Sequence, residues 1–316
     1  MQSKVKEKEK VVFFTRTGEK HAHTGVLNAN TGTVFLILVF LFSFSLIGQI
    51  DSLTNEQKDS IYIFEIQDKY EKDKVLHAEP LYIDLIRDLG ARKGEREWNV
   101  GVGMADNLTY DAYEALVEYE FAIIDRLGLE FEVPVMIYAP LNDTEQDSIP
   151  QTTIESFKMA TQWSFFVNKQ ISTSLALGYI HEFEFSSFKN FGNPLFKGQL
   201  FNPFFVAAKR WGTNFHTLIY TGPRYEHRWG KFGDGYFNYE LHTNLHYMIP
   251  GTRNFIGLEV NKYFDNEGSN ITLRPQMRVS VADNFLIGIV PGIPLNRKEE
   301  RLSMFLRIIW EPKDHH

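Results

Sequence analysis

The 316-residue chain contains no cysteine, which excludes disulfides and thiolate metal ligands. Its longest apolar run, residues 34–47, is too short for a comfortable membrane-spanning helix. Basic residues are not in excess, because 33 Lys and Arg stand against 40 Asp and Glu, for a formal net charge of −7. A disulfide-stapled domain, a helical membrane protein and a basic nucleic-acid-binding face are therefore not expected.

The chain does contain a series of consecutive segments in which every second residue is apolar or aromatic. Residues 127–137 alternate in this way, and so do residues 237–247. This period of two is typical of β-strands, and segments of ten or more aromatic-rich residues match a tilted membrane crossing. We therefore predict an all-β protein, a transmembrane antiparallel up-and-down β-barrel.

The alternation predicts twelve strands, an even number as bacterial outer-membrane barrels usually have. Connections after odd strands are long and those after even strands are tight, as a barrel requires when both termini are periplasmic. Prolines 134, 203, 223 and 275 fall inside predicted strands and each needs a bulge or a rim position. Because residues 199–208 alternate poorly, ten strands is the alternative. The predicted strands are 97–104, 113–124, 126–139, 153–167, 170–184, 199–208, 213–227, 236–248, 254–264, 269–281, 284–292 and 301–311.

Upstream of the barrel the sequence divides into two parts. Residues 1–48 are interpreted as an N-terminal extension and a signal peptide whose core is the apolar run 34–47. Residues 49–96 form a periplasmic segment in which 80–90 predict a short amphipathic helix, with Pro80 at its start and Gly90 at its end. This helix could lie at the inner rim, plug the barrel or rest on the membrane surface. The barrel then occupies 97–311, and 312–316 are a tail.

The string HAEPLYID, residues 77–84, stands in this chain in full. It resembles the HAEPLYID family of Bacteroidetes proteins, and residues 273–295 are weakly similar to the last hairpins of the phenol-degradation meta-pathway transporter-like group. The resemblance implies an outer-membrane barrel and supplies neither a role nor catalytic residues. The expected location is the outer membrane of a Gram-negative bacterium.

Strand parity points one set of charged side chains into the barrel. Acidic residues dominate the early strands and arginines the later ones, which predicts an acidic wall facing a basic wall. Such charges must meet water or each other. The predicted lumen-lining residues are Glu114, Glu118, Glu120, Glu130, Glu132, Glu182, Glu240, Glu259, Arg224, Arg228, Arg274, Arg278, Arg307, His242 and His246.

No catalytic residues, metal site or cofactor are predicted. His242 and His246 share one face of a strand, but about 13 Å should separate their Cβ atoms, too far to share a metal ion. His181 is predicted to face outward without a nearby serine motif, so a lipid hydrolase is the least favoured class.

Two other functions remain open from the sequence. The favoured one is a narrow channel for small polar or charged solutes, crossing the membrane between the two charged walls. The alternative is a closed barrel that anchors a partner protein through its long loops or through helix 80–90. Membrane lipid is an expected partner in both, and nucleic acid in neither.

Overall fold

The computed structural model describes residues 53–67, 72–83, 89–141, 149–192, 194–230, 235–266, 268–298 and 300–312. The chain divides into two compact units, 1–52 and 53–316. The predicted extension and signal peptide, together with residues 313–316 of the tail, lie outside the described residues. Across the described part, no helix has both the length and the apolar character that a bilayer crossing needs.

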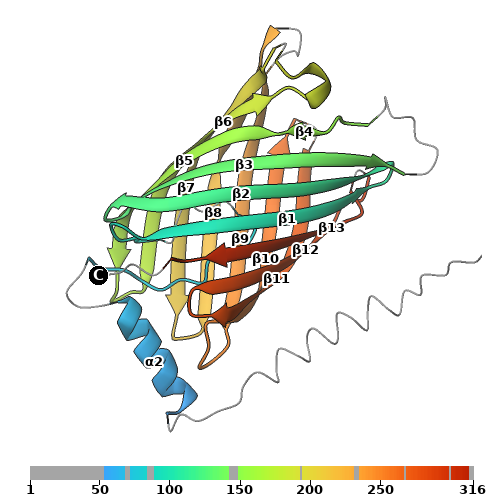
Figure 1. The fold of residues 1–316 in the computed structure, drawn as a ribbon. Coiled ribbons are helices and arrows are strands. Elements are labelled where there is room, and N and C mark those ends of the chain that lie inside the picture. The colour runs from blue at the N-terminus through green and yellow to red at the C-terminus, as the bar shows by residue number, and fades with distance from the viewer. Residues whose placement is uncertain are drawn as a thin grey trace, which may run out of the picture. The chain divides into compact units, whose positions relative to one another are not determined.

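The second unit is a single antiparallel sheet that closes on itself (Figure 1). Its strands are β1 (Arg96–Asn107), β2 (Tyr110–Ile124), β3 (Leu127–Pro140), β4 (Thr153–Ile154), β5 (Ser156–Asn168), β6 (Thr173–Phe185), β7 (Phe196–Trp211), β8 (Phe215–Arg228), β9 (Tyr236–Met248), β10 (Phe255–Asp265), β11 (Gly268–Ala282), β12 (Phe285–Pro294) and β13 (Leu302–Trp310).

Each strand pairs with its neighbours in sequence, and the ends join where β1 pairs with β13, from Trp98 opposite Trp310 to Asp106 opposite Leu302. β4 and β5 flank Glu155 and both pair with β3, so together they act as one strand. The barrel therefore has twelve strands, as predicted. The ten-strand alternative is wrong, because the poorly alternating stretch lies in β7, which pairs with β6 and β8.

The prolines predicted to need special positions fall where strand pairing is interrupted. Pro134 lies between two paired stretches of β3, opposite the break at Glu155. The β7–β8 ladder is interrupted around Pro203 and Pro223, and the β11–β12 ladder around Pro275. A missing backbone N–H causes no loss there, because no ladder bond requires it.

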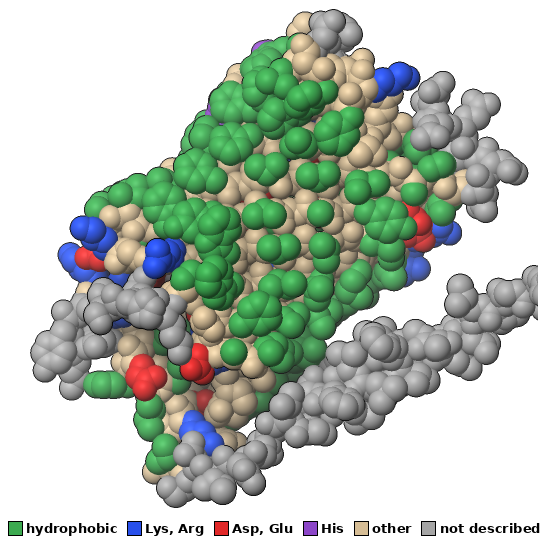
Figure 2. Space-filling view, in the orientation of Figure 1, with side chains coloured by type: hydrophobic (Ala, Val, Ile, Leu, Met, Phe, Trp, Pro, Cys, Tyr) green, Lys and Arg blue, Asp and Glu red, His purple; other side chains and the backbone are tan. Residues whose placement is uncertain are grey.

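The outer wall of the barrel is apolar. Burial alternates along each strand, and the outward residues include Val100, Val117 and Leu245, all of them exposed. Figure 2 shows hydrophobic side chains covering the visible wall between its two ends. A soluble protein rarely exposes an apolar area of this extent, whereas a lipid-facing wall requires it.

Among the described residues one short helix precedes the barrel, as predicted, but it is α2 (Asn55–Ile66), which begins with a capping box between Thr54 and Gln57. Asp59 accepts a hydrogen bond from the Gly251 backbone N–H at 2.6 Å, and Arg253 Nε donates to the Tyr62 hydroxyl at 3.2 Å. These contacts join α2 to the β9–β10 connection at the short-turn end. Of the helix predicted at 80–90, residues 80–83 and 89–90 are not helical, and 84–88 lie outside the described residues.

Candidate functional site

Residues 74–83, called the inner segment here, run inside the barrel. Val75, Ala78, Leu81 and Ile83 are almost completely buried. Leu81 occupies the space beside Gly288 on β12, where an added Cβ would lie 2.8 Å from the leucine side chain. Leu81 and Ala78 belong to a buried apolar cluster with Phe255, Val290 and Phe305 from the wall. The inner segment therefore lies within the barrel.

Two histidines hold the peptide groups of Ala78. His216 on β8 and His246 on β9 are cross-strand neighbours in register. The Ala78 N–H donates to His216 Nδ1 at 2.8 Å, while His246 Nδ1 lies 3.2 Å from the Ala78 carbonyl. The first bond requires an unprotonated Nδ1 on His216, and the second requires a proton on His246 Nδ1. His216 is therefore neutral with its proton on Nε2, whereas His246 carries a proton on Nδ1.

Further contacts hold the inner segment on both sides of Ala78. His77 Nε2 lies 2.9 Å from the Ser174 hydroxyl, and the Leu81 N–H donates to Gln276 Oε1 at 2.8 Å. The Tyr82 ring packs edge-on against Phe305 and carries the Arg274 guanidinium 3.3 Å from its centroid. The inner segment is thus hydrogen-bonded and packed like a core element.

A network of acids lines β1, β2 and β3 beside this segment. Asn99 donates to Glu97, Glu118 and Glu120, and the Arg307 guanidinium lies 3.3 Å from Glu118. Lys158 lies 3.2 Å from Glu130 and 2.9 Å from Glu132. Glu118, Glu130 and Glu132 are close enough to hold a metal ion together, but the Lys158 ammonium already provides positive charge between two of them.

The later strands carry a second network. The Glu259 carboxylate accepts from Asn261 at 2.7 Å and from Gln276 at 2.9 Å, and Arg274 Nε donates to the Asn261 amide oxygen at 2.8 Å. Arg278 stacks over Phe255 at 4.7 Å, and His242 Nδ1 accepts from the Lys262 N–H. Acids and bases are therefore mixed on each side rather than fully separated.

The predicted lumen residues divide into two groups in the structure. Buried ones, most of them in the two networks, are Glu118, Glu120, Glu130, Glu132, Glu240, Glu259, Arg274, Arg278, Arg307, His242 and His246. Those with more accessible side chains are Glu114, Glu182, Arg224 and Arg228. Arg228 pairs with Glu226 at 2.6 Å and covers the Tyr236 ring at the end of β8.

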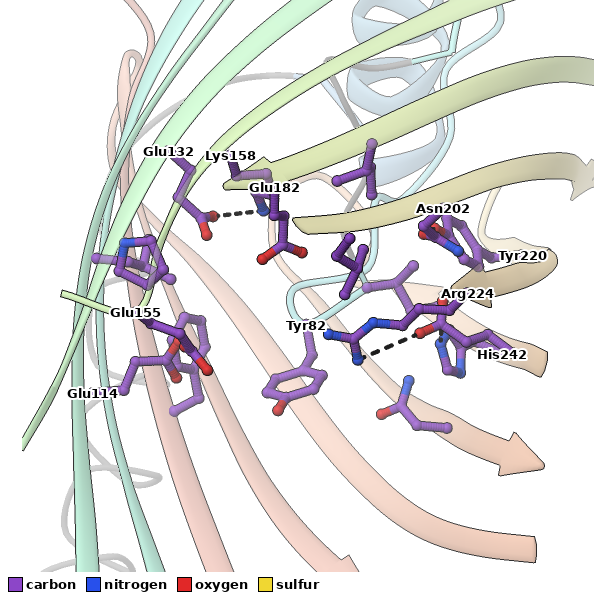
Figure 3. A pocket seen from close by; sticks show the side chains of 18 of the residues that line it. Tyr82, Glu114, Glu132, Glu155, Lys158, Glu182, Asn202, Tyr220, Arg224 and His242 are labelled. Atoms are coloured by element: carbon purple, nitrogen blue, oxygen red, sulfur yellow. Dashed lines mark hydrogen bonds and ion pairs between the residues drawn. The ribbon is translucent and has the colours of Figure 1, made fainter. Parts of the chain in front are cut away.

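Beyond the inner segment lies a polar cavity of about 250 Å³, near the strand ends that lead into the long connections. Its floor includes Tyr82 and Ile83 of the inner segment. Glu114, Glu155 and Glu182 project into it from one side, and Arg224 projects from the other (Figure 3). A separate cavity of about 210 Å³ lies at the short-turn end, against Leu76, His77 and Glu79. The inner segment thus lines both cavities from opposite sides.

Several residues of this site are absent from the predicted lumen-lining set. Lys158 alternates inward and could have been found by the same parity. Glu155 could not, because it occupies the break between β4 and β5, where the period of two fails. Asn99 and Gln276 also alternate inward, but the partners of both, and those of Tyr82, are distant in sequence and the local pattern does not identify them.

A closed twelve-stranded barrel with an apolar outer wall and a charged interior has the fold of outer-membrane channels. The crystal structure of an outer membrane channel from Pseudomonas putida F1 is similar, with a TM-score of 0.55 and 10% identity over 73% of this chain and 100% of that one. The KdgM porin gives a TM-score of 0.47 with 13% identity over 69% and 99%. No curated protein matches the sequence.

Among proteins of this fold, the chain belongs to the HAEPLYID-like family, whose model matches residues 73–311. The match begins one residue before the inner segment and ends one residue after β13. The inner segment and the barrel are therefore both parts of the family's shared region.

Proposed function

We propose that the protein is an outer-membrane channel for small polar or charged solutes and not an enzyme. The observation that carries this proposal is the 250 Å³ cavity inside a closed, lipid-compatible barrel, into which charged side chains project. Charges that face an open interior need water around them, and a hydrated charged interior is what a polar solute requires for passage. The fold shared with an outer membrane channel supports the same conclusion.

In this proposal the inner segment is the gate. It fills the short-turn half of the lumen with buried apolar side chains, and its backbone is hydrogen-bonded to His216, His246 and Gln276. A solute that enters the 250 Å³ cavity meets Tyr82 and Ile83 before it can continue. Passage therefore requires that the inner segment move.

A disulfide between the inner segment and the wall tests this proposal. Leu81 Cγ lies 3.2 Å from the Cβ position of residue 288, which is close enough for a disulfide between Leu81→Cys and Gly288→Cys. The chain has no other cysteine, so the bond would be unique. We expect the reduced double variant to conduct in a planar bilayer and the oxidised form to lose conductance, with recovery on reduction.

The two single-cysteine variants are the controls, since neither can form the bond and neither should respond to oxidant. If the oxidised double variant conducts like the reduced one, solutes pass without movement of the inner segment and the gate is refuted. If wild-type protein conducts nothing under any condition, the channel itself is refuted.

The second candidate function is a membrane-anchored scaffold. It is favoured by α2, whose Ile61 and Phe64 side chains are exposed to 43% and 57% beside the short-turn end of the barrel. Exposed apolar side chains on a helix are a common docking feature. Absent conductance together with a stable complex that is lost on Phe64→Ser would favour this function.

We also propose that the long connections face the cell exterior and that both mature termini are periplasmic. Single cysteines at Arg297 and Asp283 provide the test, because the two residues follow opposite ends of neighbouring strands. An impermeant thiol reagent applied to whole cells should label position 297 and leave 283 unlabelled. The reverse pattern would invert the barrel.

A further inference from the structure

The cavity above the inner segment has an unbalanced set of charges. Its lining includes three cationic side chains, Lys158, Arg224 and Arg307, and five carboxylates, Glu114, Glu132, Glu155, Glu182 and Glu240. Two of the cations are engaged by acids of the wall, since Lys158 pairs with Glu130 and Glu132 and Arg307 pairs with Glu118. The cavity therefore favours a ligand with net positive charge.

Two of these carboxylates lack partners among the described residues. The side chains of Glu155 and Glu182 make no hydrogen bond or ion pair with any residue that the structure describes, in contrast to the buried acids near the inner segment. Both point into the cavity (Figure 3). Glu155 can do so because it lies in the break between β4 and β5, where the chain departs from the regular ladder. They offer acceptors for an ammonium group.

The opposite side of the cavity has a different character. The Arg224 guanidinium lies 4.0 Å from the Glu240 carboxylate and donates no hydrogen bond to a described residue. Register places Tyr263 opposite Glu240 on β10, and Tyr263 also lines the cavity. A planar guanidinium with free donors binds a carboxylate in a forked geometry, while Glu240 beside it can accept from an ammonium group. Arg224 and Glu240 together therefore match the head group of an α-amino acid.

We infer that this cavity binds a basic amino acid of the lysine type, with its α-carboxylate on Arg224, its α-ammonium group toward Glu240 and its side-chain ammonium group toward Glu155 and Glu182. A volume of about 250 Å³ is below the range usual for drug-sized ligands and suits a single amino acid. This inference rests on the proposed channel function, since it names the solute class that the channel admits.

Binding is tested on the full-length protein in detergent by isothermal titration calorimetry, with three probes that differ by one group each. L-lysine carries all three charges, L-norleucine lacks the side-chain ammonium group, and pentane-1,5-diamine lacks the carboxylate. Arg224→Gln should weaken lysine and norleucine about tenfold and leave the diamine unchanged. The double variant Glu155→Gln, Glu182→Gln should weaken lysine and the diamine by a similar factor and spare norleucine.

Asp111→Asn is the matched control. Asp111 lies near the same end of the barrel at an outward-facing position of β2, and it does not line the cavity. It should leave all three affinities within about twofold of the wild type. Retention of the folded, heat-modifiable gel mobility shows that each variant is intact. Lysine binding no tighter than norleucine binding to the wild type, or lysine binding unaffected by either set of substitutions, would overturn the site.

The outcome is separable from that of the proposed function, because calorimetry in detergent does not depend on transport. Lysine binding without conductance would keep the site and reject the channel. Conductance without selective lysine binding would keep the channel and reject the site.

Discussion

The two halves of the lumen differ in how their polar groups are satisfied. In the short-turn half, the inner segment and the wall form hydrogen bonds between residues far apart in sequence, such as Ala78 with His216. In the long-loop half, Glu155, Glu182 and Arg224 face a cavity and form no hydrogen bonds through their side chains with described residues. A barrel wall of constant architecture can therefore hold a core in one half and a solvated site in the other.

The comparison predicts that the two halves respond differently to loss of a charge, and this is the largest effect we expect. Arg307→Met would leave the buried Glu118 carboxylate without its cation and should lower the free energy of unfolding by about 3–5 kcal/mol. Glu182→Gln in the open half should change it by less than about 1 kcal/mol, because the Glu182 side chain has no ion pair or hydrogen bond with a described residue to lose. The temperature at which the folded gel mobility is lost measures both. Equal losses would erase the distinction between the halves.

A smaller effect is expected from the two histidines that bind the peptide groups of Ala78. His246→Leu removes the donor to the Ala78 carbonyl and leaves that group buried without a partner, which should destabilise the inner segment by about 1–3 kcal/mol. Hydrogen exchange in residues 74–83 should accelerate while exchange in the strands is retained. Leu245→Ala, on the lipid-facing side of the same strand, serves as the control. Unchanged exchange in the variant would show that packing alone holds the segment.

The smallest effect concerns ion selectivity. Glu155→Gln with Glu182→Gln should shift the permeability ratio toward anions by about two- to threefold, and Arg224→Gln should shift it toward cations. Reversal potentials under a salt gradient measure the shift. Sequence parity alone would select Arg274 and Arg278, but their guanidinium groups stack on Tyr82 and Phe255 in the filled half. A larger shift from Arg278→Ala than from Arg224→Gln would place the conducting path in the wrong half.

The twelve strands were predictable because two solvents act on the same wall. Lipid outside and a polar interior inside impose the period of two along the whole of a strand such as β9, so its boundaries at residues 236 and 248 follow from the sequence. Even the irregular β7 was located, because its neighbours fixed where it had to lie.

The inner segment was not predictable in the same way. Its side chains suggested a helical face, but the peptide groups of Ala78 and the Leu81 N–H bond to His216, His246 and Gln276, each more than a hundred residues away. The local periodicity of a sequence does not reveal hydrogen-bond partners at that separation. Glu155 shows the complementary limit, since the break that turns it into the cavity also removes it from the alternating pattern.

The closure of β1 against β13 has a consequence for the order of assembly. Trp98 and Trp310 are at opposite ends of the barrel sequence, so β1 and β13 cannot pair until the last strand is available. The inner segment lies upstream of β1 and yet ends up enclosed, with Tyr82 against Phe305 of the final strand. Tyr82 can therefore reach its final contact only after the last strand is in place, so docking of the inner segment is completed late although its residues come first.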